Sequence, residues 1–363
     1  MRAAYLANIR FPSERAHSAQ IESMCEAFPR VGLTVDLFVS TRRFTDDARL
    51  DQFRYTFKVI KLPYGYFNAK RKLVFYFSEA VFTLSFIIRN FSKKYDYFFS
   101  RSDVIVFLLT FFIPSKKLLW EVHDLRNNFL TKYLLWRTIK IVVTSKGLLD
   151  YYHSIKYENV LLAYNGVSED FFSDVTPKID IRRTLRIDQN DFVALYIGGF
   201  DQWKGVETFF EASNILSNVN FVAVGGSNLE INNYSKIYPN VTFLGQLPYK
   251  DLKINQQVAD VLIVPNTAKN ELSEKFTSPL KLFAHMTSGI PIVASNTQSI
   301  KSIVDDPYVT FSTPDSPEAL AESIKTVRRH YEEKKGKALE LVEISRRYTW
   351  ENRAKRISDF LTV

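Results

Sequence analysis

Residues Phe276–Ser295 read FTSPLKLFAHMTSGIPIVAS, a stretch that predicts half of a doubly wound α/β unit. Ser278 followed by Pro279 is typical of a helix start, because the hydroxyl can accept from a free N–H group and proline has no N–H to leave unbonded. Apolar side chains then recur at helical spacing, and Gly289 with Pro291 marks the helix end. The final IPIVAS is typical of a short buried strand. Free N–H groups at such a helix start attract a phosphate.

Strand and helix patterns alternate along the rest of the chain, as they do in parallel sheets covered by helices. In the first half we predict strands at Arg2–Ala7, Thr34–Val39, Tyr97–Ser100, Lys117–Glu121, Ile141–Ser145 and Val160–Ala163, and helices at Ser18–Gly32, Val104–Leu109 and Lys146–His153. In the second half we predict strands at Phe192–Ile197, Phe221–Gly225, Val241–Leu244 and Asp260–Val264, and helices at Val206–Leu216, Leu252–Ala259, Pro317–Lys334, Lys337–Tyr348 and Trp350–Leu361. The pattern indicates two doubly wound domains joined near residues 170–188.

Composition narrows the possible classes. With 363 residues the chain can build two sizeable cores. The single Cys25 excludes a disulfide within the chain and a cysteine-built metal site, and the five histidines show no metal-ligand spacing. The first residues lack a long apolar core and a cleavage site, so we expect no signal peptide and a cytoplasmic location.

The positive charge is concentrated in the first half, with a net charge of +11 over residues 1–150 and −2 over residues 151–363. This asymmetry indicates an anionic partner such as a membrane surface, a phosphorylated lipid or nucleic acid, unless the lysines are merely solvated. Residues Lys70–Lys94 are basic at both ends and apolar between, too short and interrupted to span a bilayer. They predict either an interfacial helix on lipid phosphates or a core helix of the first domain.

A glycine-rich loop, Gly198–Gly205, follows a predicted buried strand and contains Lys204. Glycines let the backbone approach a phosphate closely, and a lysine adds a point charge. The dinucleotide fingerprint is absent, which argues against a nicotinamide enzyme. A second polar point is His123, which follows the strand ending in WEVHDLR, where side chains of parallel sheets meet ligands. Asp124 could orient His123 or cap the next helix.

The run Ser278–Phe283, SPLKLF, resembles the donor-site segment of the retaining glycosyltransferases of family 4, which have the GT-B fold. That resemblance implies an α/β protein with two Rossmann-like doubly wound domains facing across a cleft and a C-terminal helix crossing back to the first domain. The positions of two family glutamates hold Phe276 and Ala284 here. Nearby residues that could replace them are Glu271, Glu274 and His285.

The resemblance also implies domains and binding sites. Residues 1–175 would form the acceptor-binding domain, 176–350 the nucleotide-sugar-binding domain and 351–363 the terminal helix. Lys204 matches the loop lysine that grips the donor diphosphate, whereas Gly199 stands at the position of the loop arginine. Implied donor-binding residues are Gly198, Gly199, Lys204, Gln246, Leu247, Glu274, Thr277, Ser278, Pro279, Leu280 and Lys281.

The first loop, NIRFPSERAH, resembles the acceptor loop of family members. Implied acceptor-binding residues are Arg10, Ser13, Glu14, His17 and Arg126, and implied catalytic residues are His123 and Lys204. We therefore expect a retaining, metal-independent hexosyltransferase that moves a sugar from a nucleotide-sugar to a glycan or lipid-linked saccharide in bacterial lipopolysaccharide or capsule synthesis. It would need no cofactor and would contact an anionic membrane peripherally. A catalytically weak GT-B subunit that binds a partner glycosyltransferase or glycan is the alternative, and nucleic-acid binding ranks last because no recognition module is present.

Overall fold

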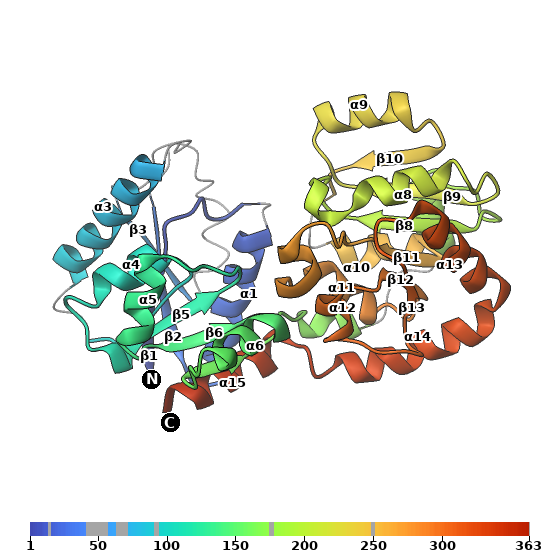
Figure 1. Cartoon of the computed structure of the whole chain (residues 1–363). Helices are drawn as coiled ribbons and strands as arrows, with labels where there is room; N and C mark the ends of the chain where they lie inside the picture. The colour runs from blue at the N-terminus through green and yellow to red at the C-terminus, as the bar shows by residue number, and fades with distance from the viewer. Residues whose placement is uncertain are drawn as a thin grey trace. The chain divides into compact units, whose positions relative to one another are not determined.

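The computed structural model describes residues 1–13, 16–40, 57–62, 72–90, 94–173, 178–247 and 251–362. The chain forms two compact units, each built around one parallel sheet (Figure 1). Unit 1 comprises Met1–Tyr164 and Trp350–Val363, and unit 2 comprises Asn165–Thr349. This architecture of two Rossmann-like sheets with alternating helices is the one that the sequence predicted.

Unit 1 contains a seven-stranded sheet with the order β3-β2-β1-β4-β5-β6-β7, in which every pair is parallel. The strands are β1 (Arg2–Ala7), β2 (Thr34–Ser40), β3 (Lys58–Leu62), β4 (Tyr97–Ser100), β5 (Leu118–Val122), β6 (Lys140–Val143) and β7 (Val160–Leu162). Its helices are α1 (Ala16–Arg30), α3 (Lys72–Asn90), α4 (Asp103–Leu109), α5 (Phe129–Trp136), α6 (Lys146–Ser154) and α15 (Trp350–Thr362), with a short 3₁₀ turn η1 (Ser115–Lys117). The order reverses between β1 and β4, so their carboxyl ends border the switch point where such sheets bind ligands.

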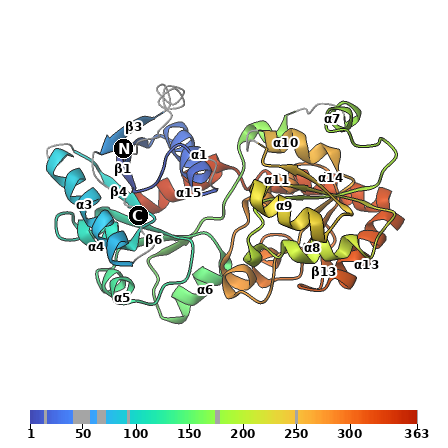
Figure 2. The ribbon, with the colours of Figure 1, turned by 90° about the horizontal axis from the view of Figure 1, so that it is seen from above.

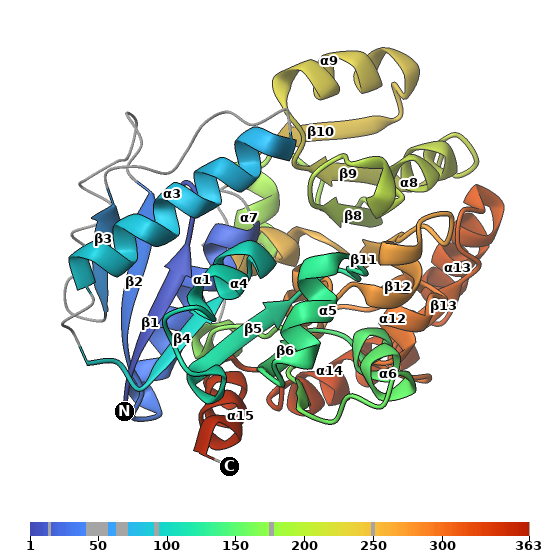
Figure 3. The ribbon, with the colours of Figure 1, turned by 60° about the vertical axis from the view of Figure 1, so that its left-hand side comes forward.

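Helices cover both faces of this sheet, which explains why its central strands are apolar throughout. The helices α3, α4 and α5 pack in series on one face, and α1 packs against α15 on the other (Figures 2 and 3). The terminal helix α15 is tied down by an ion pair of Glu351 with Arg30 and by a hydrogen bond from the Tyr97 hydroxyl to the Leu361 carbonyl, at 2.5 and 2.8 Å. The expected return of the C-terminal helix to the first domain is therefore confirmed.

Unit 2 contains a six-stranded parallel sheet with the order β10-β9-β8-β11-β12-β13. The strands are β8 (Val193–Ile197), β9 (Asn220–Val224), β10 (Val241–Gly245), β11 (Val261–Val264), β12 (Ile292–Ser295) and β13 (Thr310–Ser312). Its helices are α7 (Lys178–Thr184), α8 (Val206–Ser213), α9 (Asn228–Ile237), α10 (Leu252–Asn255), α11 (Leu280–Met286), α12 (Gln298–Lys301), α13 (Pro317–Arg329) and α14 (Tyr331–Ser345). Short turns are η2 (Glu169–Phe172), η3 (Gln202–Lys204), η5 (Gln256–Val258) and the π-helical η6 (Leu272–Phe276).

The start of α11 differs from the prediction. The helix begins at Leu280 after Pro279, and no side chain caps it. The Ser278 hydroxyl instead accepts from the Asn165 N–H at 3.3 Å, and its carbonyl accepts from the Asn165 side chain at 2.8 Å. These bonds tie Asn165, the first residue of unit 2, to the start of α11.

Candidate functional site

Three glycines line the carboxyl edge of the unit 2 sheet. The Gly225 N–H donates to the Gly245 carbonyl at 2.7 Å, and the Gly198 N–H donates to the Val224 carbonyl at 2.9 Å. A Cβ atom on Gly225 would lie 1.9 Å from the Gly198 carbonyl oxygen, so no other residue fits there. The ends of β8, β9 and β10 thus form a bare backbone edge that a ligand can approach closely.

Lys204 is presented by a tight turn beside this edge. It ends η3 and is followed by Gly205 at φ +68°, where a Cβ atom would lie 2.0 Å from the Pro265 carbonyl oxygen. The Lys204 ammonium forms an ion pair with Asp201 at 2.6 Å. It also lies over Gly199, because a Cβ atom added to that glycine would be 2.8 Å from Nζ. The lysine therefore occupies the space next to residue 199, where the resemblance implied an arginine.

Lys281, in the first turn of α11, carries the second cation of this edge. Its Nζ atom is buried and has no hydrogen-bond partner among the described residues, and it lies 4.3 Å from the centre of the Tyr196 ring. Burial, together with the charge of Lys204, lowers the pKa of Lys281 to about 7. A buried ammonium without a carboxylate partner is costly, and an incoming anion would relieve that cost.

Of the three possible replacement residues, Glu274 has a carboxylate oxygen unpartnered in the described chain, and His285 has an unpartnered Nε2 atom but is fully buried. Glu274 lies on η6, which packs against η3, and its Oε1 accepts from the Gln298 N–H at 3.3 Å. Its second oxygen is buried and has no hydrogen-bond partner among the described residues. Glu271 is exposed and paired with Lys275, and His285 is fully buried against Gln256.

The remaining predicted donor residues fall into two groups around this edge. Gln246 and Leu247 directly follow β10, Thr277, Ser278 and Pro279 connect η6 to α11, and Leu280 is the first residue of α11. Ser278 is buried and bonded to Asn165, so its hydroxyl already has a structural role. The structure thus brings Gly198, Gly199, Lys204, Glu274 and Lys281 to neighbouring elements of the same sheet edge.

His123 directly follows β5 in unit 1 and is held by Glu121, two residues earlier on the same side of the strand. Its Nε2 lies 2.7 Å from Glu121 Oε1. Glu121 also accepts from Arg353 on α15 at 3.0 Å, from Gln20 at 2.6 Å and from the Tyr5 hydroxyl at 3.3 Å. His123 is thereby fixed by a buried network that includes the terminal helix.

The charges of this network set the protonation of its members. Burial alone would raise the pKa of Glu121, but the Arg353 charge and the His123 hydrogen bond hold it well below its usual range. Burial and the charge of Arg101 lower the pKa of His123 to about 4, against the opposite influence of Glu121. The imidazole is therefore neutral at pH 7, with its proton on Nε2 toward Glu121 and its Nδ1 available as an acceptor.

A cavity of about 280 Å³ lies next to His123 in unit 1, at the carboxyl ends of β1, β4 and β5. Of the predicted acceptor-binding residues, His17 and Arg126 line this cavity. Arg10 is exposed elsewhere on the first loop, and the Ser13 N–H donates to the Ser18 hydroxyl. Glu14 lies outside the described residues.

Arg126 is held by carboxylates, with Asp103 at 2.7 Å and Asp124 at 3.2 Å. Asp124 therefore neither orients His123 nor caps α5. Glu121 orients His123. Asn128 caps α5, because its side chain accepts from the Thr131 N–H.

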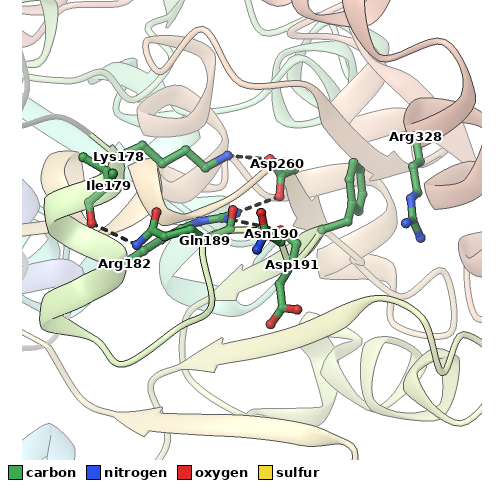
Figure 4. A pocket seen from close by; sticks show the side chains of 9 residues that line it. Lys178, Ile179, Arg182, Gln189, Asn190, Asp191, Asp260 and Arg328 are labelled. Atoms are coloured by element: carbon green, nitrogen blue, oxygen red, sulfur yellow. Dashed lines mark hydrogen bonds and ion pairs between the residues drawn. The ribbon is translucent and has the colours of Figure 1, made fainter.

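A larger cavity, of about 450 Å³, lies at the amino ends of β8 and β11 in the unit 2 sheet (Figure 4). Its charged side chains bond one another, since Asp260 accepts from both Lys178 and Arg182, and Arg182 also donates to the carbonyls of Gln189 and Asp191. The remaining cation, Arg328, donates to the Asn218 carbonyl. This network joins α7 to β8 and β11, so we interpret it as structural.

Comparisons with known proteins agree with this geometry. Residues 191–330 match the family model described as glycosyl transferases group 1, a segment that includes the glycine loop, η6 and α11. An uncharacterized glycosyltransferase from Methanocaldococcus jannaschii is 23% identical over 242 residues, which cover 61% of this chain. The match spans 59% of that relative's own length.

Solved structures of several proteins are similar to the whole chain. Sucrose-phosphate synthase from Thermosynechococcus elongatus has a TM-score of 0.81 at 18% identity, with 99% of this chain and 98% of that chain covered. Anabaena HepE in complex with UDP and glucose has a TM-score of 0.74 at 17% identity, covering 100% and 99%. WaaG, a glycosyltransferase involved in lipopolysaccharide biosynthesis, has a TM-score of 0.69 at 14% identity, covering 99% of both. These likenesses show the GT-B fold, and with the family match they support a glycosyltransferase.

Proposed function

We propose that this chain is a retaining glycosyltransferase that uses a nucleotide-sugar donor, as the family 4 resemblance implies. The observation that carries this proposal is the pair of cations at the carboxyl edge of the unit 2 sheet. Lys204 lies on the glycine loop, and the buried Nζ of Lys281 lacks a partner among the described residues. A diphosphate would supply the negative charge that the Lys281 ammonium lacks.

In the proposed reaction the two lysines stabilise the departing nucleoside diphosphate, whose charge grows as the bond to the sugar breaks. The bare backbone at Gly198 lets the diphosphate approach, and Glu274 binds the ribose through its open carboxylate oxygen. These residues supply the positive charge themselves, so we propose transfer without a metal ion.

We assign His123 to the donor sugar, the role that the family resemblance implies. The neutral imidazole keeps one nitrogen on Glu121 and offers Nδ1 as a hydrogen-bond acceptor for a sugar hydroxyl. The acceptor is a saccharide, free or lipid-linked, in surface polysaccharide synthesis. The likeness to WaaG supports that pathway.

The test is hydrolysis and transfer of nucleotide-sugars by the purified full-length chain. A thermal-shift panel of UDP-, GDP-, ADP- and dTDP-sugars first finds the donor, since a ligand that binds the folded state raises the melting temperature. The anomeric configuration of the product, read by proton NMR, then tests retention. If no nucleotide-sugar shifts the melting temperature or is turned over, the proposed activity is wrong.

A catalytically weak subunit is the second candidate, favoured by Gly199, Phe276 and Ala284 at the positions of three charged family residues. It predicts nucleotide-sugar binding with neither hydrolysis nor transfer. A normal turnover number would exclude it.

We also propose that unit 1 contacts an anionic membrane surface through α3. This helix is long and apolar enough to cross a bilayer, contrary to the sequence prediction, and only 33% of its apolar window is buried. Phe82 and Phe86 pack into the unit, whereas Leu73 and Ile88 are 82% and 79% exposed. With Leu84 these two form one outward stripe about 60° wide at 100° per residue. An apolar stripe opposite a packed face suits an interfacial helix rather than a span.

The charged residues of the layer formed by α3, α4 and α5 favour anionic lipids. Exposed cations on or beside α3, α4 and α5 are Arg89, Lys94, Lys116 and Lys132. The acidic residues between 72 and 140 are buried or ion-paired in the described chain, except Asp96. Such an excess of surface lysine and arginine is attracted to anionic headgroups.

Vesicle sedimentation tests this contact. The full chain should bind phosphatidylglycerol-containing vesicles more tightly than pure phosphatidylcholine, and Leu84→Glu with Ile88→Glu should abolish binding. Ile237→Glu, an exposed apolar site on α9, is the matched control. Unchanged sedimentation of the double variant would contradict the membrane contact, and a loss of dimer mass in that variant would assign the stripe to a second copy instead.

A further inference from the structure

Glu79 on α3 is a buried carboxyl group that lines the cavity beside His123. It is only 3% exposed, and its Oε1 accepts from the Asn8 side-chain amide at 2.9 Å. Its other oxygen, Oε2, is buried and has no hydrogen-bond partner within the described residues. Burial raises the pKa of Glu79, and the hydrogen bond from Asn8 limits that rise.

Asn8 leaves a second acceptor open on the same cavity wall. Its amide nitrogen donates to both Glu79 and the Ser78 hydroxyl, at 2.9 and 3.0 Å. That contact with a carboxylate fixes the orientation of the amide, because the oxygen would be repelled there. The Asn8 Oδ1 is consequently left buried without a partner in the described chain.

The other buried carboxylates described in unit 1 each have a cation. Asp36 bonds Arg2, Asp103 bonds Arg126, and Glu121 bonds Arg353. Glu79 forms no such ion pair within the described residues, although Arg126 lines the same cavity. Buried polar atoms are nearly always satisfied, so two open acceptors on residues that line the same cavity indicate a missing donor.

The cavity has the size and lining of a small-molecule site. Its volume of about 280 Å³ is far larger than the roughly 30 Å³ share of one water molecule. Leu6, Ile9 and Phe75 supply apolar surface beside the polar groups. Phe75 is 39% exposed, so part of its ring is accessible to a ligand. An apolar wall with a few convergent polar atoms is typical of ligand pockets.

We propose that Glu79 and Asn8 bind hydroxyl groups of the saccharide acceptor, with Phe75 contacting the apolar face of its ring. This assignment rests on the proposed glycosyl transfer and locates the acceptor subsite beside His123. A sugar fits because neighbouring hydroxyls donate two hydrogen bonds in one direction, which is what the two open oxygens require.

The key variant is Glu79→Gln, which keeps the shape and the bond from Asn8 but turns the open oxygen into a donor. With methyl glycosides of glucose, galactose and mannose as soluble acceptors, we expect the acceptor KM to rise about 10- to 100-fold, as for loss of a hydrogen bond to a charged group. Donor hydrolysis without acceptor should remain unchanged. Thr83→Val is the control, because Thr83 is buried one turn later on α3 and donates to the backbone carbonyl of Glu79, so this variant changes the same helical turn but not the Glu79 carboxyl group.

A deoxy-sugar series identifies the hydroxyl that Glu79 holds. Removing that hydroxyl from the acceptor should raise the acceptor KM of the wild type about 10-fold or more. The acceptor KM of Glu79→Gln should hardly change, so the effects of the missing hydroxyl and of the substitution should not be additive. Additive losses, or an acceptor KM that Glu79→Gln leaves unchanged, would overturn the subsite and assign the cavity to ordered water. Failure of every glycoside both to accept sugar and to bind by saturation-transfer NMR would also count against it. Absent donor hydrolysis in the wild type would instead overturn the proposed function.

Stability provides an independent readout. Glu79→Met removes a buried carboxyl group whose second oxygen is unsatisfied, so we expect a higher melting temperature together with lost acceptor transfer. A carboxyl that only supports the fold predicts the opposite, a lower melting temperature with the acceptor KM unchanged. A variant that melts lower and keeps its acceptor KM would therefore contradict the proposal.

Discussion

Glu121 in unit 1 has four hydrogen-bond partners, whereas Lys281 in unit 2 has none among the residues that the structure describes. Both side chains carry their polar atoms in buried surroundings at the carboxyl edge of a parallel sheet. The difference shows what each edge is built to do. A fully paired carboxylate holds His123 in one orientation, while an unpaired cation keeps an anion site open at a cost in stability.

The largest expected effect comes from breaking the paired side of the comparison. Arg353→Ala leaves Glu121 as a buried charge without its cation, so we expect the free energy of unfolding to fall by about 3–5 kcal/mol. Denaturant titration followed by circular dichroism measures this loss. Arg30→Ala is the matched control, because it removes an exposed ion pair of the same α15 and should cost at most about 1 kcal/mol. Equal losses would show that the Glu121 network contributes no more than a surface pair.

His123→Ala tests what the paired network holds in place. We expect kcat for sugar transfer to fall about 100- to 1000-fold, because a positioned polar group is removed from the sugar. Nucleotide affinity should change less than about twofold. His153→Ala, an exposed histidine on α6, is the control. Parallel losses of turnover and nucleotide affinity would contradict the assigned role.

The pH profile of the wild type sharpens the same assignment. Since the pKa of His123 is lowered to about 4, the imidazole stays neutral as the pH falls from 7 to 5.5. Transfer should therefore show no histidine-type decline near pH 6.5 that the His123→Ala variant lacks. A decline that disappears in this variant would place the titration on His123 and contradict a neutral imidazole.

Lys204→Ala tests the open side of the comparison. Removing one of two cations at a diphosphate should lower kcat/KM for the donor about 100-fold, because charge-assisted contacts in a site of this kind contribute roughly 2–3 kcal/mol. Steady-state kinetics with the donor found in the thermal-shift panel provides the measurement. Lys275→Ala removes an exposed lysine that pairs with Glu271 and should have little effect. Unchanged kinetics in Lys204→Ala would move the donor site elsewhere.

The local sequence pattern was sufficient to predict several of the strands whose carboxyl ends carry the candidate site residues. Strands β1 and β4 have the predicted bounds, because their apolar runs are buried on both faces and need no distant information. Helix α9 was missed although its signal is present in the sequence, a capping box of Ser227 with Glu230.

The side-chain networks depend on contacts that sequence spacing does not show. The Ser278 hydroxyl bonds Asn165, 113 residues away, instead of capping its own helix. Glu121 bonds Arg353 across 232 residues, so its link to His123 could be inferred only from their alternate positions on one strand. Glu79 lies on a helix that reads as apolar, and only the fold brings it to Asn8.

A more gradual effect concerns the proton on Lys281. Its pKa of about 7 in the free protein means that the ammonium is increasingly neutral above pH 7, and a bound diphosphate would raise this pKa again. The affinity for a nucleoside diphosphate should therefore fall by at most tenfold per pH unit from pH 7 toward 9, where the phosphate itself is already fully ionised. Calorimetry in buffers of different ionisation enthalpy should show proton uptake on binding, and Lys281→Met should remove both the uptake and the pH slope. If the slope persisted in that variant, the proton would belong to another group, and the unpaired lysine would no longer distinguish the anion edge of unit 2 from the paired edge of unit 1.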